Sequence, residues 1–130
     1  MARIRVLAAV FAGGAAGTLL RAGLAEAVAR DDPAAWPWAT FAANLIGAFL
    51  LGWWATRLSR PGVDPRLRPL LTTGLCGGLT TFSTLQVELV GMLRADEWCV
   101  AAGYVAASVG LGVLAVLAGR RAAGARGVPR

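Results

Sequence analysis

The sequence predicts an all-α membrane protein with four transmembrane helices in a single domain. The chain has 130 residues, of which 57% are hydrophobic and only 15% are charged, whereas a soluble domain carries about 25% charged residues. Its hydrophobic residues fall into long stretches, and a helix of roughly 20 such residues crosses a bilayer. There is no histidine, and Cys76 and Cys99 lack the spacing of a zinc site, so we expect two buried thiols that pack as small hydrophobes. These observations exclude a soluble enzyme and a nucleic-acid-binding protein, although the net charge is +6.

Four segments of the single domain 1–130 are expected to span the membrane. They are residues 4–28, 36–56, 69–93 and 98–119. The second and fourth contain uncharged stretches of sufficient length, and the first and third reach that length if each tolerates one charged residue. Tryptophan prefers the headgroup level of a bilayer, and tryptophans mark both ends of the second span and the start of the fourth. These are Trp36, Trp38, Trp53, Trp54 and Trp98.

Small and polar residues in the first two spans are expected to make contacts with other helices. In the first span, Gly13 and Gly17 form a GxxxG pair, which allows another helix to approach closely. Arg21 lies near the end of this span, where it is either buried or extends its guanidinium group to the interface. In the second span, Asn44 lies at mid-membrane, with Thr40 one turn earlier on the same helix face. Asn44 fits either a hydrogen bond between helices or an ion path.

The third span is predicted to be broken near its middle. Residues 72–84 read TTGLCGGLTTFST, and nine of these thirteen are glycine, serine or threonine. The Gly77–Gly78 pair weakens the helix, and nearby hydroxyl groups compete for its backbone partners. Unsatisfied backbone groups are costly in hydrocarbon, so irregular backbone is tolerated where it is buried in protein or lines an ion path. The alternative is a packing face of small residues whose hydroxyls bond to their own helix.

The fourth span adds polar side chains to those of the other spans. Tyr104 and Ser108 lie one helical turn apart, and Glu88 follows the irregular part of the third span. Ser108 can also bond back to its own helix, and Arg21 and Glu88 can extend from span ends. Together with Asn44, these residues form a polar track with few ionisable groups, which suits an anion better than a proton relay.

The positions of the basic residues, all thirteen of which are arginine, predict the orientation of the chain. With four spans, ten of them share one side of the membrane, whereas only Arg30 and Arg94 lie on the other side, beside four acidic residues. The ten are Arg3, Arg5, Arg57, Arg60, Arg66, Arg68, Arg120, Arg121, Arg126 and Arg130. Because basic loops remain in the cytoplasm, we expect both termini to be cytoplasmic and one orientation to predominate.

Three segments of the chain carry a family resemblance. They are GGAAGTLLRAGL at 13–24, WATFAANLIGAFLLG at 38–52 and GLCGGLTTFSTLQVE at 74–88. In order, spacing and motif these segments resemble the Fluc (CrcB) family of small bacterial fluoride channels, and the third is the most specific. The resemblance covers nearly the whole chain. It implies a multi-pass protein of the bacterial cell membrane that exports cytoplasmic fluoride passively through two narrow pores in a dimer of antiparallel subunits.

The resemblance also implies roles for individual residues. Asn44 corresponds to the pore asparagine and Phe82 to the first of two pore phenylalanines, while the carbonyl groups of Gly77 and Thr80 correspond to those that hold a structural sodium ion at the dimer centre. The other fluoride-pathway residues are Thr81, Ser83, Tyr104 and Ser108, and the charged family positions are Arg21 and Glu88. The residue types agree with this chemistry, because fluoride is tightly hydrated and hydroxyl, amide and aromatic-edge donors can replace its water shell.

Two positions depart from the family pattern, and both bear on assembly. Leu85 replaces the second pore phenylalanine, and Gly112 replaces a residue that often carries a hydroxyl group in the family. A homodimer of antiparallel copies also needs one sequence to insert in both orientations, whereas the arginines favour one. The sequence therefore leaves a homodimer open and favours a heterodimer with a homologue of opposite charge bias.

Two other functions stand as alternatives to a channel. A proton-coupled small multidrug exporter also uses four short spans, but it needs a membrane-embedded carboxylate early in the chain, and the first span has only Glu26 at its end. A non-conducting membrane assembly subunit explains helix packing but not the irregular third span. The sequence thus predicts a channel subunit and no enzyme.

Overall fold

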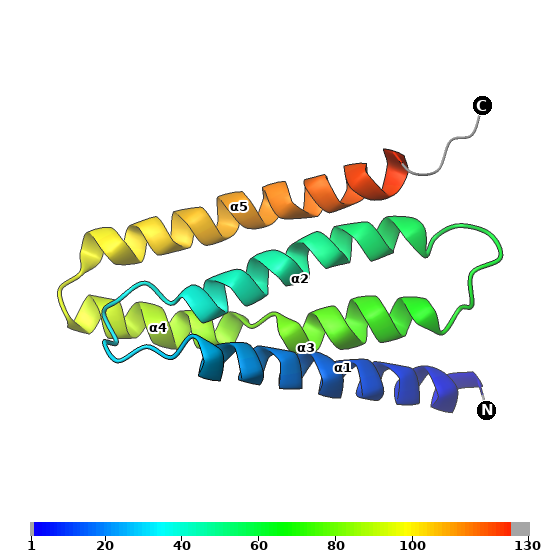
Figure 1. The fold of residues 1–130 in the computed structure, drawn as a ribbon, viewed down its shortest axis with the longest axis horizontal. Coiled ribbons are helices and arrows are strands. Elements are labelled where there is room, and N and C mark those ends of the chain that lie inside the picture. The colour runs from blue at the N-terminus through cyan, green and yellow to red at the C-terminus, as the bar shows by residue number, and fades with distance from the viewer. Residues whose placement is uncertain (1, 126–130) are drawn as a thin grey trace.

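The chain folds into a bundle of helices (Figure 1). The computed structural model describes residues 2–125, and among these it contains helices and turns but no strand. The long helices are α1 (Ala2–Ala27), α2 (Trp38–Arg57) and α5 (Trp98–Ala125). Three shorter elements lie between α2 and α5: the π-helical segment η1 (Pro69–Cys76), α3 (Gly77–Leu79) and α4 (Phe82–Arg94). The predicted all-α class is confirmed.

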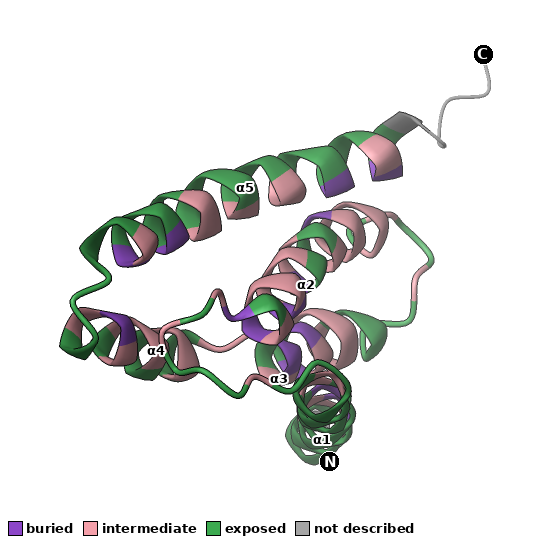
Figure 2. Ribbon diagram, turned by 60° about the vertical axis from the view of Figure 1, so that its left-hand side comes forward, coloured by how far each residue is buried: buried purple, intermediate pink, exposed green. Residues whose placement is uncertain are grey.

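The helices lie side by side and alternate in direction along the chain (Figure 1). α1 and the segment from η1 to α4 run one way, and α2 and α5 run the other way, so the start of α1 and the end of α5 lie at the same end of the bundle. α1 packs against η1 and α3, and α2 packs against α5. Buried residues lie on the inward faces, while the outward faces of α1 and α5 are largely exposed (Figure 2).

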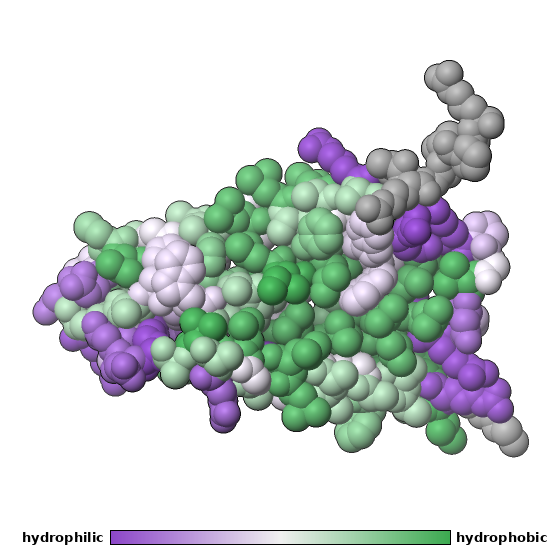
Figure 3. Space-filling model, in the orientation of Figure 1, coloured by the Kyte–Doolittle hydropathy of each residue, from purple (hydrophilic) through white to green (hydrophobic). Residues whose placement is uncertain are grey.

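The outer surface of the bundle suits a bilayer. α1, α2 and α5 each contain a stretch that is long and apolar enough to cross a membrane. Their side chains form an apolar belt between two hydrophilic ends (Figure 3). Phe11 and Val109 are 79% and 64% exposed, as expected for side chains that face lipid or a second subunit. The chain is therefore a multi-pass membrane protein.

Most helix ends lie within two residues of the spans expected from the sequence, and two of the differences have a clear cause. α2 begins at Trp38 rather than at residue 36, because Pro37 precedes it and Trp36 belongs to the loop. α5 continues to Ala125, beyond residue 119, because the alanine- and arginine-rich stretch that follows consists mainly of good helix formers.

The third expected span, residues 69–93, is not one continuous α-helix. Thr80 and Thr81 have extended backbone, with ψ angles of 151° and 127°, between α3 and α4. Each of the elements η1, α3 and α4 is shorter than a bilayer span. Gly77 itself is helical, with φ −65° and ψ −36°, so the extended residues lie beyond the Gly77–Gly78 pair. The π-helical form of η1 has no signal in the sequence pattern.

Glycines allow the backbones of α1 and η1 to touch. A methyl group on Gly13 or Gly17 of α1 would collide with the backbone of η1, and one on Gly74 or Gly78 would collide with the backbone of α1. The Gly13–Gly17 pair thus lies at a helix interface. Its counterpart is a second pair with the same spacing, Gly74 and Gly78, so these two glycines form the packing face of small residues that was the alternative interpretation of this segment.

We expect Gly17→Ala to destabilise the protein, because the added methyl group must push α1 away from η1. Overpacking of this kind costs about 1–3 kcal/mol, so the thermal midpoint in detergent, followed by circular dichroism, should fall by several degrees. Gly23→Ala is the matched control, since nothing lies within 4 Å of a methyl group there. It should leave the midpoint unchanged or raise it slightly. Equal midpoints for the two variants would contradict this packing.

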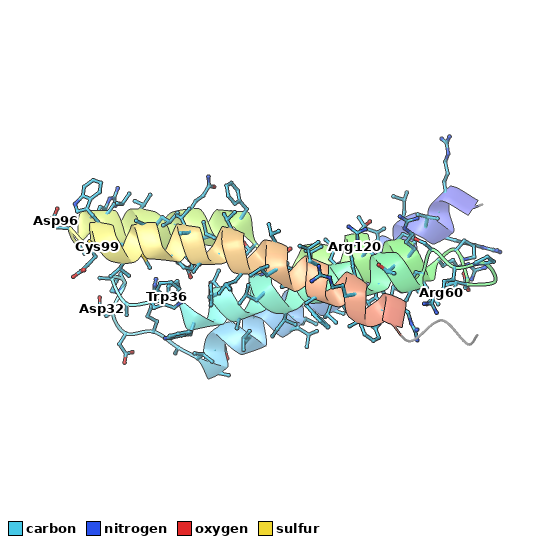
Figure 4. The ribbon with its side chains drawn as sticks, turned by 90° about the horizontal axis from the view of Figure 1, so that it is seen from above. Asp32, Trp36, Arg60, Asp96, Cys99 and Arg120 are labelled. Carbon is cyan, nitrogen blue, oxygen red and sulfur yellow. The ribbon has the colours of Figure 1, made fainter. Side chains whose placement is uncertain are left out.

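A small cluster of buried hydrophobic side chains joins α4 to α5. Tyr104 and Met92 are fully buried, and Leu85 packs against the cluster that they form. Cys76 is also buried, at 3% exposure. Cys99 is exposed in the first turn of α5 (Figure 4), so the prediction of a buried thiol is wrong for Cys99, because this turn lies at the edge of the bundle.

Candidate functional site

Asn44 binds the backbone where the third segment is extended. Its Oδ1 atom accepts a hydrogen bond from the Thr81 N–H at 2.8 Å, and its Nδ2 atom donates to the Thr81 carbonyl at 3.2 Å. One side chain of α2 therefore satisfies both backbone groups of a residue outside any helix, as the membrane interior demands. The Thr81 hydroxyl in turn accepts from the Thr84 N–H at 3.2 Å and caps the start of α4.

Arg21 binds a carbonyl group that the extended segment leaves without its helical donor. In a continuous α-helix the Thr81 N–H would bond to Gly77 and the next N–H to Gly78. The Thr81 N–H goes to Asn44 instead, and the Gly78 carbonyl accepts from Arg21 Nε at 3.2 Å. The guanidinium group is thus partly buried against the third segment, where its positive charge faces the carboxyl end of α3.

Gly77 and Thr80, the residues matched to sodium ligands, line a hollow between the third segment and α2. Its volume is about 270 Å³, and its lining also includes Thr72 and Thr73. Carbonyl and hydroxyl oxygens are the ligands that hard cations prefer. The described residues contain no group of three His, Cys, Asp or Glu side chains that could hold a metal ion. The oxygen donors at this hollow therefore fit a hard cation.

Glu88 of α4 joins α2 and α5 in a second polar cluster. The Thr40 hydroxyl donates to Glu88 Oε1 at 2.6 Å, and the Tyr104 hydroxyl donates to Glu88 Oε2 at 2.8 Å. Thr40 is only 8% exposed, and Tyr104 is fully buried. Hydrogen bonds to a carboxylate are short and strong, so neutral hydroxyl groups from two helices hold this acidic side chain in the bundle.

A larger hollow, of about 520 Å³, opens beside the Glu88 cluster. Its lining combines Glu88 and Thr40 with Arg30 and Trp36 of the loop between α1 and α2. Arg30 donates to a carbonyl of the same loop at 2.8 Å. The hollow lies toward the end of the bundle at which Trp36 and Asp32 are found (Figure 4). It thus links the polar interior to one surface.

The remaining predicted pathway residues differ in how far they are exposed. Phe82 is 72% exposed at the start of α4, and Ser83 is exposed beside it. The Ser108 hydroxyl is buried and has no hydrogen-bond partner among the described residues, so it does not bond back to its own helix and can serve a ligand. Leu85 packs into the core cluster.

Thr40 was not predicted as a site residue, although its spacing from Asn44 puts both on one face of the second span. The contact between Arg21 and Gly78, which are 57 residues apart, was not predicted either. Contacts of this kind depend on which helices become neighbours, and the sequence pattern of one span does not contain that information.

Comparisons with known proteins agree with these features. Residues 8–120 match the family model described as CrcB-like protein, Camphor Resistance (CrcB). The chain is similar to the protein named Fluoride-specific ion channel FluC 1 of Mycolicibacterium paratuberculosis, with 58% identity over 113 residues that cover 86% of this chain and 85% of that protein. It is 44% identical over 111 residues to the Fluoride-specific ion channel FluC of Chlorobaculum tepidum, which covers 85% of this chain and 87% of that protein. The resemblance seen in the sequence is confirmed, and the chain belongs to the CrcB family, a family of ion channels and not of enzymes.

Proposed function

We propose that this chain is a subunit of a fluoride-selective channel that exports cytoplasmic fluoride passively. The observation that carries the proposal is that Asn44 and Ser108 each keep a neutral donor for a ligand. The Asn44 side chain uses one of its two amide hydrogens on the Thr81 carbonyl, and Ser108 keeps a buried hydroxyl without a partner among the described residues. Such N–H and O–H groups can replace the water shell of a small anion. Membership of the CrcB family, whose relatives are named as fluoride channels, supports the choice of ion.

The pathway is completed by a second subunit. Phe82 is 72% exposed, and the edge of its ring carries partial positive charge that attracts anions. A second, antiparallel subunit that covers this ring turns it into the wall of a narrow pore, and two such pores form in the dimer. The apolar outer faces of α1 and α5 provide surface for this contact as well as for lipid.

We assign the hollow at Gly77 and Thr80 to a structural sodium ion at the centre of the dimer. The Thr81 N–H, which would bond to Gly77 in a helix, is bound by Asn44. The Thr84 N–H, which would bond to Thr80, is bound by the Thr81 hydroxyl. Both carbonyl oxygens have thereby lost their helical donors, and the sodium ion would take their place with the same groups of the partner subunit.

The favoured partner is a homologue inserted in the opposite orientation. Arg60 and Arg120 lie at one end of the bundle, and Asp32 and Asp96 lie at the other (Figure 4). The basic end therefore faces the cytoplasm, together with both termini. Because this chain has one preferred orientation and Leu85 packs in its own core, the inverted subunit supplies the missing pore aromatic. A homodimer is the alternative.

Fluoride release from vesicles tests the proposed function. The chain is reconstituted together with the inverted homologue, and a fluoride-selective electrode records release in the absence of a proton gradient. We expect rapid passive release, slowed by about tenfold or more in Phe82→Ile, which removes an aromatic edge from the path. Phe11→Ile is the matched control, since Phe11 is 79% exposed on α1 and isoleucine keeps this position apolar for contact with lipid or a second subunit, so release should stay unchanged. Drug movement that requires a proton gradient would identify an exporter instead, and a stable but silent complex would identify an assembly subunit.

A further inference from the structure

Two adjacent arginines line a hollow in the basic half of the bundle. Arg120 and Arg121 of α5 line it together with Leu117 and with Thr56 of α2, and its volume is about 370 Å³. Figure 4 shows Arg120 in the half of the bundle away from Trp36, inward of Arg60. Figure 3 shows hydrophilic atoms bordering the apolar belt over this end of α5. The hollow thus lies where the apolar belt meets hydrophilic surface.

These two arginines differ from their neighbours in having no partner within the described chain. Arg57 lies over the Trp53 ring, 5.6 Å from its centroid, and Arg60 donates to the Ala123 carbonyl at 3.1 Å. Arg120 and Arg121 are exposed and make no hydrogen bond or ion pair with any described residue. Two adjacent guanidinium groups therefore lack a counter-charge at this position.

An apolar strip of α5 continues from Leu117, in the lining of the hollow, toward the middle of the helix. Leu117 and Leu114 lie one and two turns before Arg121 on the same face of α5 and are 38% and 60% exposed. Behind them, Gly119 and Gly52 bring the backbones of α5 and α2 into contact, and a methyl group on either glycine would collide with the other helix. The apolar strip thus lies on a part of α5 that is packed closely against α2.

We propose that this hollow binds the phosphate of an anionic phospholipid, with one acyl chain along Leu117 and Leu114. Guanidinium groups match phosphate oxygens in paired hydrogen bonds, and basic pockets between transmembrane helices on the cytoplasmic side suit anionic headgroups. The apolar strip selects a lipid over free inorganic phosphate, because only the lipid gains from contact with the leucines. This site is distinct from the fluoride pathway and does not depend on ion passage.

Native mass spectrometry of the full-length protein in detergent tests the site, with phosphatidic acid and phosphatidylcholine as probes. Wild-type protein should retain phosphatidic acid over phosphatidylcholine by roughly tenfold or more, as two arginines near the headgroups imply. Arg120→Gln/Arg121→Gln should lose this preference. Arg66→Gln/Arg68→Gln is the matched control, since it removes the same charge from exposed loop positions and should keep the preference.

Two further measurements distinguish a bound phospholipid from free inorganic phosphate. Leu117→Gln leaves the charge unchanged and should weaken retention of phosphatidic acid, whereas excess inorganic phosphate should not displace it. An equal loss in both arginine double variants would overturn the proposal in favour of general charge attraction. Displacement by inorganic phosphate would overturn it in favour of a site for the free ion. Circular dichroism spectra that match the wild type show that each variant is folded.

Discussion

Vesicles that contain only this chain are expected to release fluoride no faster than protein-free vesicles, and addition of an oppositely biased homologue is expected to restore release. The reason is geometric. An antiparallel dimer needs one subunit in each orientation, and the arginines at one end of this bundle oppose inversion. The measurement is electrode-detected fluoride release from the two preparations at equal protein content. Rapid release by the chain alone would reject the heterodimer and favour the homodimer.

The exposed thiol of Cys99 allows the orientation to be measured separately. Cys99 lies at the acidic end of the bundle and is exposed, whereas Cys76 is buried. A maleimide that does not cross membranes should therefore label Cys99 almost completely from outside intact cells. A Cys99→Ser variant should show no labelling and serves as the control. Labelling of about half the molecules would mean that the chain inserts both ways, which would contradict a fixed orientation even if release by the chain alone were slow.

Much of the fold follows from the sequence, because hydrophobic length and the tryptophans locate the long helices by local physical rules. The pairing of helices does not follow in the same way. The Gly13–Gly17 signal predicted a close contact, but its partner could be identified only once η1 was placed against α1. The structural role of the glycines at 77 and 78 also depends on the fold. Gly78 is required for close packing, and the extended backbone occurs at Thr80 and Thr81 instead.

The same holds for the candidate site: the sequence predicts which residues belong to it but not which groups they contact. The sequence identified Asn44, Arg21 and Glu88 as polar groups at risk of burial in the membrane. It did not identify what satisfies them, because each partner lies on another helix. The structure pairs Arg21 with the Gly78 carbonyl, and it pairs Glu88 with hydroxyl groups of α2 and α5. The polar character of single residues could thus be predicted from the sequence, whereas their hydrogen-bond partners could be identified only from the structure.

Replacement of Asn44 is expected to have the largest effect of any single substitution in the pathway. Asn44→Ala leaves the Thr81 N–H and carbonyl without their partner, and each unsatisfied buried group costs about 1–3 kcal/mol. If these costs fall on the conducting arrangement of the extended segment, its population decreases by about a hundredfold. Electrode-detected release from vesicles that contain the subunit pair should decrease by the same factor. Size-exclusion chromatography should still show the proposed dimer, because the substitution leaves the apolar outer faces of α1 and α5 unchanged.

Two further variants separate the bond to Thr81 from a general effect of removing a polar side chain. Asn44→Asp keeps an oxygen that accepts from the Thr81 N–H but loses the donor to the Thr81 carbonyl and adds negative charge, so it should also block fluoride release. Ser59→Ala is the control, because the Ser59 hydroxyl donates only to the nearby Ala55 carbonyl, at 2.6 Å, and release should stay at the wild-type rate. Wild-type release by Asn44→Ala would show that the extended segment holds its conformation without α2. In that case the amide would have to be removed from the proposed pathway, since neither its bond to the backbone nor its free hydrogen would be needed for conduction.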